Sequence, residues 1–230
     1  MVKYHFITFA TDDHMSFAQN NVKSALDIGG FDTATIYTLN DIDNYFKEKN
    51  SYILNQPRGS GYWLWKPYFI MKKILEVDEG DIVCYNDSRY QWLKNIKELE
   101  NQVLINKNIG VFVNKPNGDT HYEKKWTKLD ALTLMWIPQG DFRNYVKKSH
   151  QAWAGLVLIR KSFNPVLFVG EWLTYSKDPR IITDNKSLFG PEDKEFTENR
   201  HDQTVLSLLL KKWGIPTHHL ENGYLLNLRN

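Results

Sequence analysis

The sequence contains very little cysteine and no long apolar run. Its one cysteine, Cys84, excludes a disulfide within the chain, which agrees with a reducing compartment. No window approaches the roughly 18 consecutive apolar residues of a membrane-spanning helix, and the N-terminus has no basic start followed by an apolar core. We therefore expect a water-soluble protein without a membrane span, located in the cytoplasm or at the inner face of its membrane, with peripheral membrane contact left open.

Neither sign of charge dominates. The 29 basic and 27 acidic side chains give a net charge of +2, which is too weak a field to concentrate nucleic acid along the surface. Nucleic acid is therefore not an expected partner, and any anion site has to be built locally. Aromatic residues are abundant at 14% of the chain, and their rings either fill a core or stack on sugars and bases.

Several common catalytic motifs are missing from the sequence. It has no GxxxxGK[ST] phosphate loop, no GxGxxG after the first expected strand, no GxSxG elbow, no HExxH and no CxxC. These absences exclude P-loop kinases, standard dehydrogenases, α/β-hydrolases and the common zinc enzymes.

The order of the expected elements indicates one α/β domain over residues 1–230, a length that suits a single large domain. The strand, helix, strand order at the start favours parallel pairing. Asp41 is a plausible N-cap for the second helix, and Pro67 suits the first position of the third. Residue patterns predict strands over 4–10, 33–39, 81–85, 109–113 and 155–159, and helices over 15–28, 41–49, 67–77, 123–135, 165–175 and 202–213.

The run Asp81–Tyr85 is nearly all apolar, which is typical of a central strand covered on both faces. Cys84 within it is expected to be a small buried hydrophobe. Residues 86–89 (NDSR) follow at the carboxyl end of this strand, where open α/β sheets place their ligands. Asp87 could hold a divalent metal there, or it could simply form a turn.

The segment Arg58–Pro67 combines two glycines, three aromatic residues and two cations just before a helix. Free N–H groups and the helix dipole favour an anion at a helix start, and Arg58 and Lys66 would add positive charge. The alternative is an aromatic corner that packs on the sheet and leaves both cations in solvent.

Residues 200–203 (RHDQ) open the last amphipathic helix. Asp202 is either a helix-capping acid or a functional carboxylate. The polar loop before it, residues 184–200, is long enough to be a functional flap.

Four blocks in this order, RGSGYWLWKPYFI, DIVCYNDS, WAGLVLIRKS and ENRHDQTVLSLL, resemble a family of small GT-A glycosyltransferases of bacterial surface-polysaccharide clusters and chlorella-type viruses. The wider pattern is similar to the retaining transferases of the glycogenin and lipopolysaccharide-galactosyltransferase type. The resemblance implies an α/β GT-A fold with a central, mostly parallel sheet flanked by helices. It also implies transfer of a sugar from a nucleoside-diphosphate sugar, with UDP as the expected nucleotide, to a glycan or glycolipid acceptor.

The resemblance further implies the roles of several residues. Asp202 would act as a base or orient a hydroxyl, and Gln203 would lie beside the transferred sugar. Asp87 would be the first acid of a DxD metal motif for Mn²⁺ or Mg²⁺, with either His218 or His219, here assigned to His219, as a further ligand. Arg89 stands where the second acid is expected, so it could instead pair with the diphosphate in place of a metal.

The remaining donor contacts follow from the same resemblance. Thr8 and Thr11 would lie by the base, and Gly155 would let the backbone approach the donor sugar because it has no side chain. The other donor-binding residues implied by the resemblance are Arg58, Tyr62, Trp65, Lys66, Trp153, Ala154 and His201.

Two other functions deserve comparison. A noncatalytic carbohydrate-binding protein could use Trp63, Trp65 and Trp153 as sugar platforms, although such modules are usually β-sandwiches. A nucleotidyltransferase would need a glycine-rich loop after the first strand, and Thr8–His14 contains no glycine. The transferase hypothesis requires Lys66 and Asp87 to face one crevice.

Overall fold

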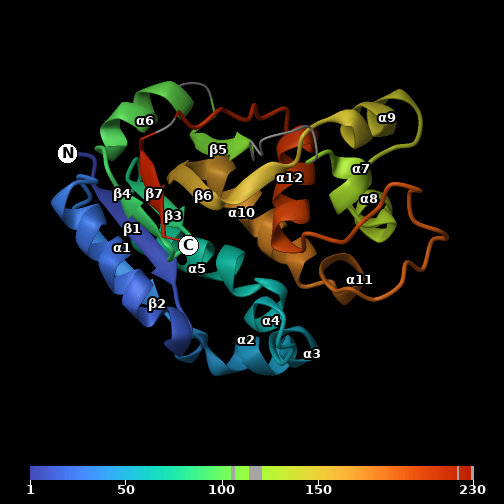
Figure 1. The fold of residues 1–230 in the computed structure, drawn as a ribbon, viewed down its shortest axis with the longest axis horizontal. Helices are drawn as coiled ribbons and strands as arrows, with labels where there is room; N and C mark the ends of the chain where they lie inside the picture. The colour runs from blue at the N-terminus through green and yellow to red at the C-terminus, as the bar shows by residue number, and fades with distance from the viewer. Residues whose placement is uncertain (105–106, 114–120, 222, 229–230) are drawn as a thin grey trace.

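The computed structural model of the chain describes residues 1–104, 107–113, 121–221 and 223–228 (Figure 1). Among these residues the main sheet has five strands in the order β2-β1-β3-β6-β5, and β4 and β7 form a separate two-stranded sheet. The strands are β1 Tyr4–Phe9, β2 Thr33–Tyr37, β3 Ile82–Asn86, β4 Tyr90–Trp92, β5 Ile109–Val113, β6 Ala152–Arg160 and β7 Leu225–Asn227.

The main sheet is mixed. Strand β1 pairs in parallel with β2 and β3, whereas β6 pairs antiparallel with both β3 and β5. Strand β5 therefore points the same way as β1, β2 and β3, and β6 alone runs in the opposite direction. The α/β class is confirmed, and the expected parallel pairing holds for one half of the sheet only.

The helices are α1 Met15–Asp27, α2 Asn44–Lys49, α3 Ser51–Leu54, α4 Gly59–Tyr62, α5 Trp65–Glu76, α6 Ile96–Val103, α7 Glu123–Trp126, α8 Leu129–Leu134, α9 Asp141–Lys148, α10 Phe163–Ser176, α11 Pro179–Ile182 and α12 Asp202–Lys212. Two 3₁₀ turns cover Asp12–His14 and Leu39–Asp41. Figure 1 places α7, α8 and α9 at the end of the molecule away from α1. None of the helices in the described part of the chain is long and apolar enough to cross a bilayer.

Three of the predicted helices differ in their ends or caps from the sequence-based prediction. The N-cap of α2 is Asp43, which accepts a hydrogen bond from the Phe46 N–H at 2.7 Å, because Asp41 is engaged in a capping box with Thr38. Helix α5 begins at Trp65, two residues before Pro67. The helix expected over 123–135 is split into α7 and α8, since the backbone is extended at residues 127 and 128.

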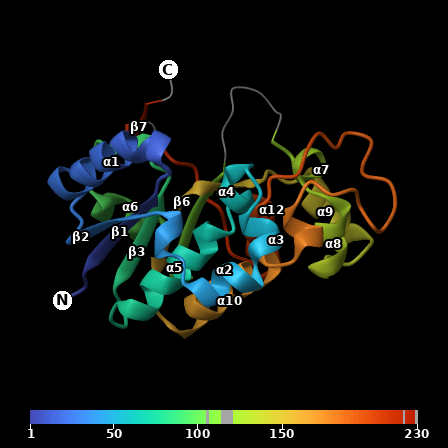
Figure 2. The ribbon, with the colours of Figure 1, turned by 90° about the horizontal axis from the view of Figure 1, so that it is seen from below.

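Helices cover both faces of the sheet, as Figure 2 shows for α1 on one side and α5 and α10 on the other. Alternate side chains of β3 pack into the cores on the two faces of the sheet. Ile82 and Cys84 belong to the core with α1 and α6, and Val83 and Tyr85 belong to the core with α5, α10 and α12. Cys84 is fully buried, as expected, and burial raises the pKa of its thiol well above the ordinary value.

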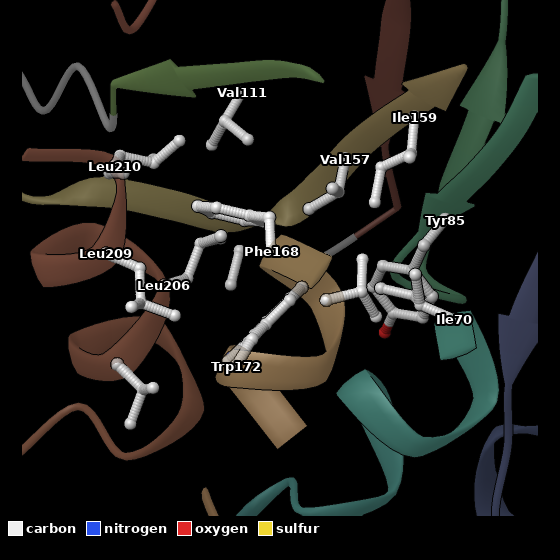
Figure 3. Packing of buried hydrophobic residues seen from close by; sticks show 14 of the residues in the cluster. Ile70, Tyr85, Val111, Val157, Ile159, Phe168, Trp172, Leu206, Leu209 and Leu210 are labelled. Carbon is white, nitrogen blue, oxygen red and sulfur yellow. The ribbon is translucent and has the colours of Figure 1, made fainter. Parts of the chain in front are cut away.

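The larger core fixes α12 against the sheet. Phe168 and Trp172 of α10 lie between the sheet residues and the leucines of α12 (Figure 3). Full burial of each such side chain contributes roughly 1.5–3 kcal/mol. This packing holds the start of α12, at Asp202, near the ends of β3 and β6.

Candidate active site

Asp87 lies directly after β3 and its backbone is held by neighbouring polar groups. The Asp87 N–H donates to Gly155 O at 3.0 Å, and the Asn21 side chain donates to Asp87 O at 3.0 Å. The preceding residue, Asn86, donates through its side chain to Gly155 O at 2.8 Å and accepts from the Thr8 hydroxyl at 2.8 Å. These contacts fix the Asp87 backbone, and the Tyr85 hydroxyl donates to the Asp87 carboxylate at 2.6 Å.

A buried ammonium group lies between two carboxylates at this point. Lys66 Nζ is 3.4 Å from Asp87 Oδ1 and 3.3 Å from Asp202 Oδ2, and it donates to Ala154 O at 3.2 Å. Lys66 is only 4% exposed and Asp202 only 3%. Lys66 and Asp87 therefore face one crevice, as the transferase hypothesis requires.

The two acids share one cation, and this has electrostatic consequences. Burial has the largest effect on Asp202 and raises its pKa. Attraction to Lys66 lowers this pKa and repulsion from Asp87 raises it, and together the three effects bring it to about 6. Burial alone would lower the pKa of Lys66, but attraction to Asp202 and Asp87 outweighs it and raises that pKa. Asp202 Oδ2 is buried within ion-pair distance of Lys66 and has no well-oriented hydrogen bond.

The segment before α5 is a left-handed turn. Five consecutive residues from Gly59 to Trp63 have positive φ, and three of them are not glycine. A left-handed conformation costs a non-glycine residue roughly 1–2 kcal/mol. At Gly61 a Cβ would lie 2.7 Å from the Leu54 Cα, so a side chain cannot be accommodated there. Strain of this kind is maintained at functional sites.

Because of this turn, the start of α5 does not offer the free N–H groups that were expected to bind an anion. The Lys66 N–H donates to Trp63 O at 2.9 Å, and Pro67 has no N–H to offer. The first turn of the helix thus lacks the set of free donors that an anion needs, and that part of the prediction is wrong. The positive charge near α5 comes from side chains instead.

The backbone of His201 is also strained, because its φ is positive at 55° with ψ at −120°. Its buried ring lies against the rings of Tyr62 and Trp63, with centroids 4.9 and 5.2 Å away. Its Nδ1 donates to Ile182 O at 2.7 Å, and burial lowers the pKa of this imidazole. The two strained segments therefore support each other beside Asp202.

Two cavities adjoin at this edge of the sheet, and they share Trp63 and Asp87. We name the first the aromatic cavity; it measures about 370 Å³ and is lined by Phe9, Ala10, Thr11, His14, Pro57, Gly59, Ser60, Trp63, Trp65, Tyr85, Asp87, Ser88 and Arg89. We name the second the polar cavity; it measures about 330 Å³ and is lined by Arg58, Trp63, Lys66, Asp87, His121, Trp153, Ala154, Gly155, Arg200, His201, Asp202 and Gln203.

Most residues that the resemblance implied line one of these cavities. Thr11, Trp65 and Arg89 line the aromatic cavity. The polar cavity is lined by Arg58, Lys66, Asp87, Trp153, Ala154, Gly155, His201, Asp202 and Gln203. The structure thus brings together residues from five separate stretches of the chain.

Three implied residues line neither cavity. Thr8 is fully buried and uses its hydroxyl to hold Asn86, so it supports the strand end rather than reaching a ligand. Tyr62 packs its ring on His201. His219 is exposed in the segment after α12.

Two other implied residues have roles within the protein. Gly155 was expected to let its backbone approach a sugar, but a Cβ there would lie 2.3 Å from the Trp153 indole, so the space is filled by that ring. Gln203 accepts from the Ala154 N–H at 3.2 Å and donates to Gln151 at 2.7 Å, and thereby ties α12 to β6.

The sequence analysis gave no role to three lining residues of note. Arg200 is adjacent to the recognised His201 and Asp202, so its position was a usable signal. His121 lies outside all four motif blocks. His14 accepts a hydrogen bond from the Arg89 guanidinium, a contact between residues 75 positions apart that sequence spacing does not indicate.

The donor set does not fit a divalent cation such as Mn²⁺ or Mg²⁺, which needs several oxygen ligands. Among the residues that the structure describes, Asp87 and Asp202 are the acids that line the two cavities, and both are paired with Lys66. The position of a second DxD acid is taken by Arg89, a cation. Within the described ranges no cluster of three or more His, Cys, Asp or Glu residues could hold a metal ion.

No protein-family model matches the chain, and no curated protein matches it in sequence. Among solved structures, the chain is similar to mouse xyloside xylosyltransferase 1 in its apo form, with a TM-score of 0.49, 11% identity, and coverage of 96% of this chain and 85% of that one. It is also similar to a glycosyltransferase involved in glycosylation of the major capsid of PBCV-1, with a TM-score of 0.45, 10% identity, and coverage of 94% and 82%. A third similar structure is the galactosyltransferase LgtC in complex with donor and acceptor sugar analogs, with a TM-score of 0.39, 12% identity, and coverage of 74% and 61%. At these scores and identities the similarities assign no role to any residue of this chain.

Proposed function

We propose that the chain is a glycosyltransferase that moves a sugar from a nucleoside-diphosphate sugar to a glycan acceptor. The observation that carries this proposal is the buried Lys66 between Asp87 and Asp202, at the junction of an aromatic and a polar cavity. Clefts at the carboxyl ends of parallel strands are the usual ligand sites of α/β sheets.

The two cavities suit the two ends of such a donor. Trp63 and Tyr85 contribute rings to the aromatic cavity, and rings of this kind stack on a base or cover a ribose. Carboxylates accept hydrogen bonds from sugar hydroxyls, and the polar cavity offers them from Asp87 and Asp202. The diphosphate would then lie between the base and the sugar, beside Arg58 and Arg200 of the polar cavity.

Asp202 is the proposed catalytic carboxylate. With a pKa of about 6 it is mostly ionised at neutral pH and still basic enough to accept a proton. It would take the proton of the acceptor hydroxyl in a transfer that inverts the anomeric centre, and it would orient a sugar hydroxyl in one that retains it. Lys66 would keep Asp202 and Asp87 in place through their shared ion pairs.

Further parts of the proposal depend on the family resemblance. These are UDP as the nucleotide, a glycan or glycolipid acceptor in polysaccharide or glycoconjugate synthesis, and a location in the cytoplasm or at the inner membrane face. A single domain over residues 1–230 also stays a prediction. The Mn²⁺ or Mg²⁺ implied by the resemblance is not included, because the residues present do not fit it.

No observation favours a noncatalytic carbohydrate-binding protein. Trp65, one of its expected platforms, is only 5% exposed and stacks on Phe9 with ring centroids 3.8 Å apart. Trp153 lies across Gly155, in the wall of the polar cavity. Trp65 is therefore a core residue rather than an open sugar platform.

Calorimetric titration tests the proposed function. The wild-type chain should bind UDP, and the binding should weaken when uridine replaces UDP because the diphosphate contacts are lost. A carbohydrate-binding protein would instead bind free sugars and would not bind UDP. Binding of sugars alone would overturn the proposal.

A further inference from the structure

We propose that Arg58 and Arg200 form the binding site for the donor diphosphate, that Glu198 occupies this site in the structure described, and that UDP binds there without a divalent cation. The inference rests on the proposed function and specifies how that site holds its ligand.

The two arginines converge on one carboxylate. Arg58 Nη2 donates to Glu198 Oε2 at 2.6 Å, and Arg200 Nη1 lies 3.1 Å from Glu198 Oε1. Each oxygen of Glu198 is thus bound by a different guanidinium. Both arginines line the polar cavity, although they are 142 positions apart in the sequence.

A phosphate group can occupy the same position between the two guanidinium groups as the Glu198 carboxylate. Guanidinium groups bind carboxylates and phosphates through the same charge-assisted hydrogen bonds, and a diphosphate carries more charge and more acceptor oxygens than a carboxylate. A diphosphate can therefore take the place of Glu198 with a net gain in attraction. The Arg58 contact already lowers the pKa of Glu198, in line with a strong anion site.

The arginines are held independently of Glu198. The Arg200 guanidinium lies over the Trp126 ring at 4.1 Å, and its backbone N–H donates to Trp126 O at 3.2 Å. Arg58 directly precedes the left-handed turn and has a second partner in Asp184, at 3.2 Å. Both side chains therefore keep contacts when Glu198 moves away.

Glu198 has room to leave. It belongs to the irregular stretch between α11 and α12, and about a third of its side chain is exposed. A third cavity of about 570 Å³ is lined by Arg58, Asp184 and Glu198 among others. The carboxylate can turn into this space without any change in the core.

The charge balance of the polar cavity explains why a metal is not needed. Lys66 is paired with both Asp87 and Asp202, and among the described lining residues Arg58 and Arg200 are the arginines that can exchange Glu198 for another anion. Two fixed guanidiniums supply the positive charge that a divalent cation supplies to diphosphates elsewhere. A metal-free site also agrees with the finding that Asp87 and Asp202 do not fit a divalent cation.

The test is UDP titration of the full chain in excess EDTA and in MnCl₂, with the variants Arg58→Gln, Arg200→Gln and Glu198→Gln. Wild type should bind UDP equally in both buffers. Each arginine variant should lose about 10- to 100-fold in UDP affinity, the size of a charged hydrogen bond, and keep its affinity for uridine. Glu198→Gln should bind UDP about twofold to fivefold more tightly, because a competing surface pair is removed.

Glu195→Gln is the matched control, because Glu195 lies in the same stretch but pairs with Lys124 outside the cavity. It should leave UDP affinity unchanged. If the arginines merely held the stretch in place, Glu198→Gln would break the same contacts and weaken UDP binding as they do, and that result would overturn the inference.

Two further outcomes separate the inference from the proposed function. UDP binding that appears only with MnCl₂ would overturn the metal-free site and leave the transferase proposal standing. No UDP binding in either buffer would end both.

Discussion

Lys66 Nζ lies 3.3 Å from Asp202 Oδ2, although both side chains are almost completely buried. A buried ion pair is usually no more stabilising than apolar residues of the same volume, but removing one partner leaves an uncompensated charge. Asp87 shares the same ammonium. On the proposed function, these charges at the junction of two cavities serve a ligand.

Lys66→Met should destabilise the chain by about 3–5 kcal/mol at pH 8, because two carboxylates lose their common cation. The loss should be smaller at pH 5, where Asp202 can be protonated. Urea denaturation at the two pH values measures this. Lys73→Met, on the same helix but in a pair with the half-exposed Glu76, is the control and should cost about 1 kcal/mol or less.

Asp202→Asn should slow transfer while the chain stays folded, because the amide keeps the shape and cannot accept a proton. General-base catalysis contributes about 10²- to 10⁴-fold, so turnover should fall by that factor. Steady-state kinetics with circular dichroism of the same sample measures both properties. Unchanged turnover in a folded variant would remove Asp202 from the mechanism.

The pKa of about 6 for Asp202 predicts opposite effects of pH on stability and activity. The folded chain binds this proton more tightly than the unfolded chain, so the contribution of Asp202 to stability falls as the pH rises from about 4 to about 6. The ionised form is the base, so turnover should rise through pH about 6.

Comparison with Asp202→Asn isolates these effects from other titrating groups. The stability difference between wild type and variant should change across pH 4 to 6, and the inflection in residual turnover near pH 6 should be absent from the variant. An inflection that persists in Asp202→Asn would assign it to another group.

Gly155→Ala should displace the Trp153 ring from the cavity wall, because the new Cβ would lie 2.3 Å from the indole. Overpacking of this kind costs about 1–3 kcal/mol. Gly170→Ala is the matched control: its Cβ would meet only Met71, at 3.4 Å, and alanine favours the helix by roughly 0.5–1 kcal/mol. Thermal unfolding with tryptophan fluorescence distinguishes them, and equal melting temperatures would contradict the proposed packing.

Local patterns were sufficient to predict much of what lies together at the candidate site. The apolar run that ends at Tyr85 predicted a central strand with Asp87 at its end, and the structure has both. The density of cations and rings around Lys66, and the helix start at Asp202, also predicted positions that lie together. These signals are local, because each depends on a few neighbouring residues.

Other features depend on contacts between distant parts of the chain. The left-handed turn over residues 59–63 is held by packing of Tyr62 and Trp63 on His201, and propensity does not indicate it. The reversed direction of β6 is not encoded in its apolar pattern, because strands of either direction bury the same faces. The Arg58 and Glu198 pair joins residues 140 positions apart.

The most direct test of the central claim is release of nucleoside diphosphate from a panel of nucleotide sugars, with Asp202→Asn measured alongside. We predict that wild type consumes at least one donor, with or without manganese, and that the variant does not. If wild type leaves every nucleotide sugar intact at millimolar concentration, the Lys66, Asp87 and Asp202 cluster is not a sugar-transfer site.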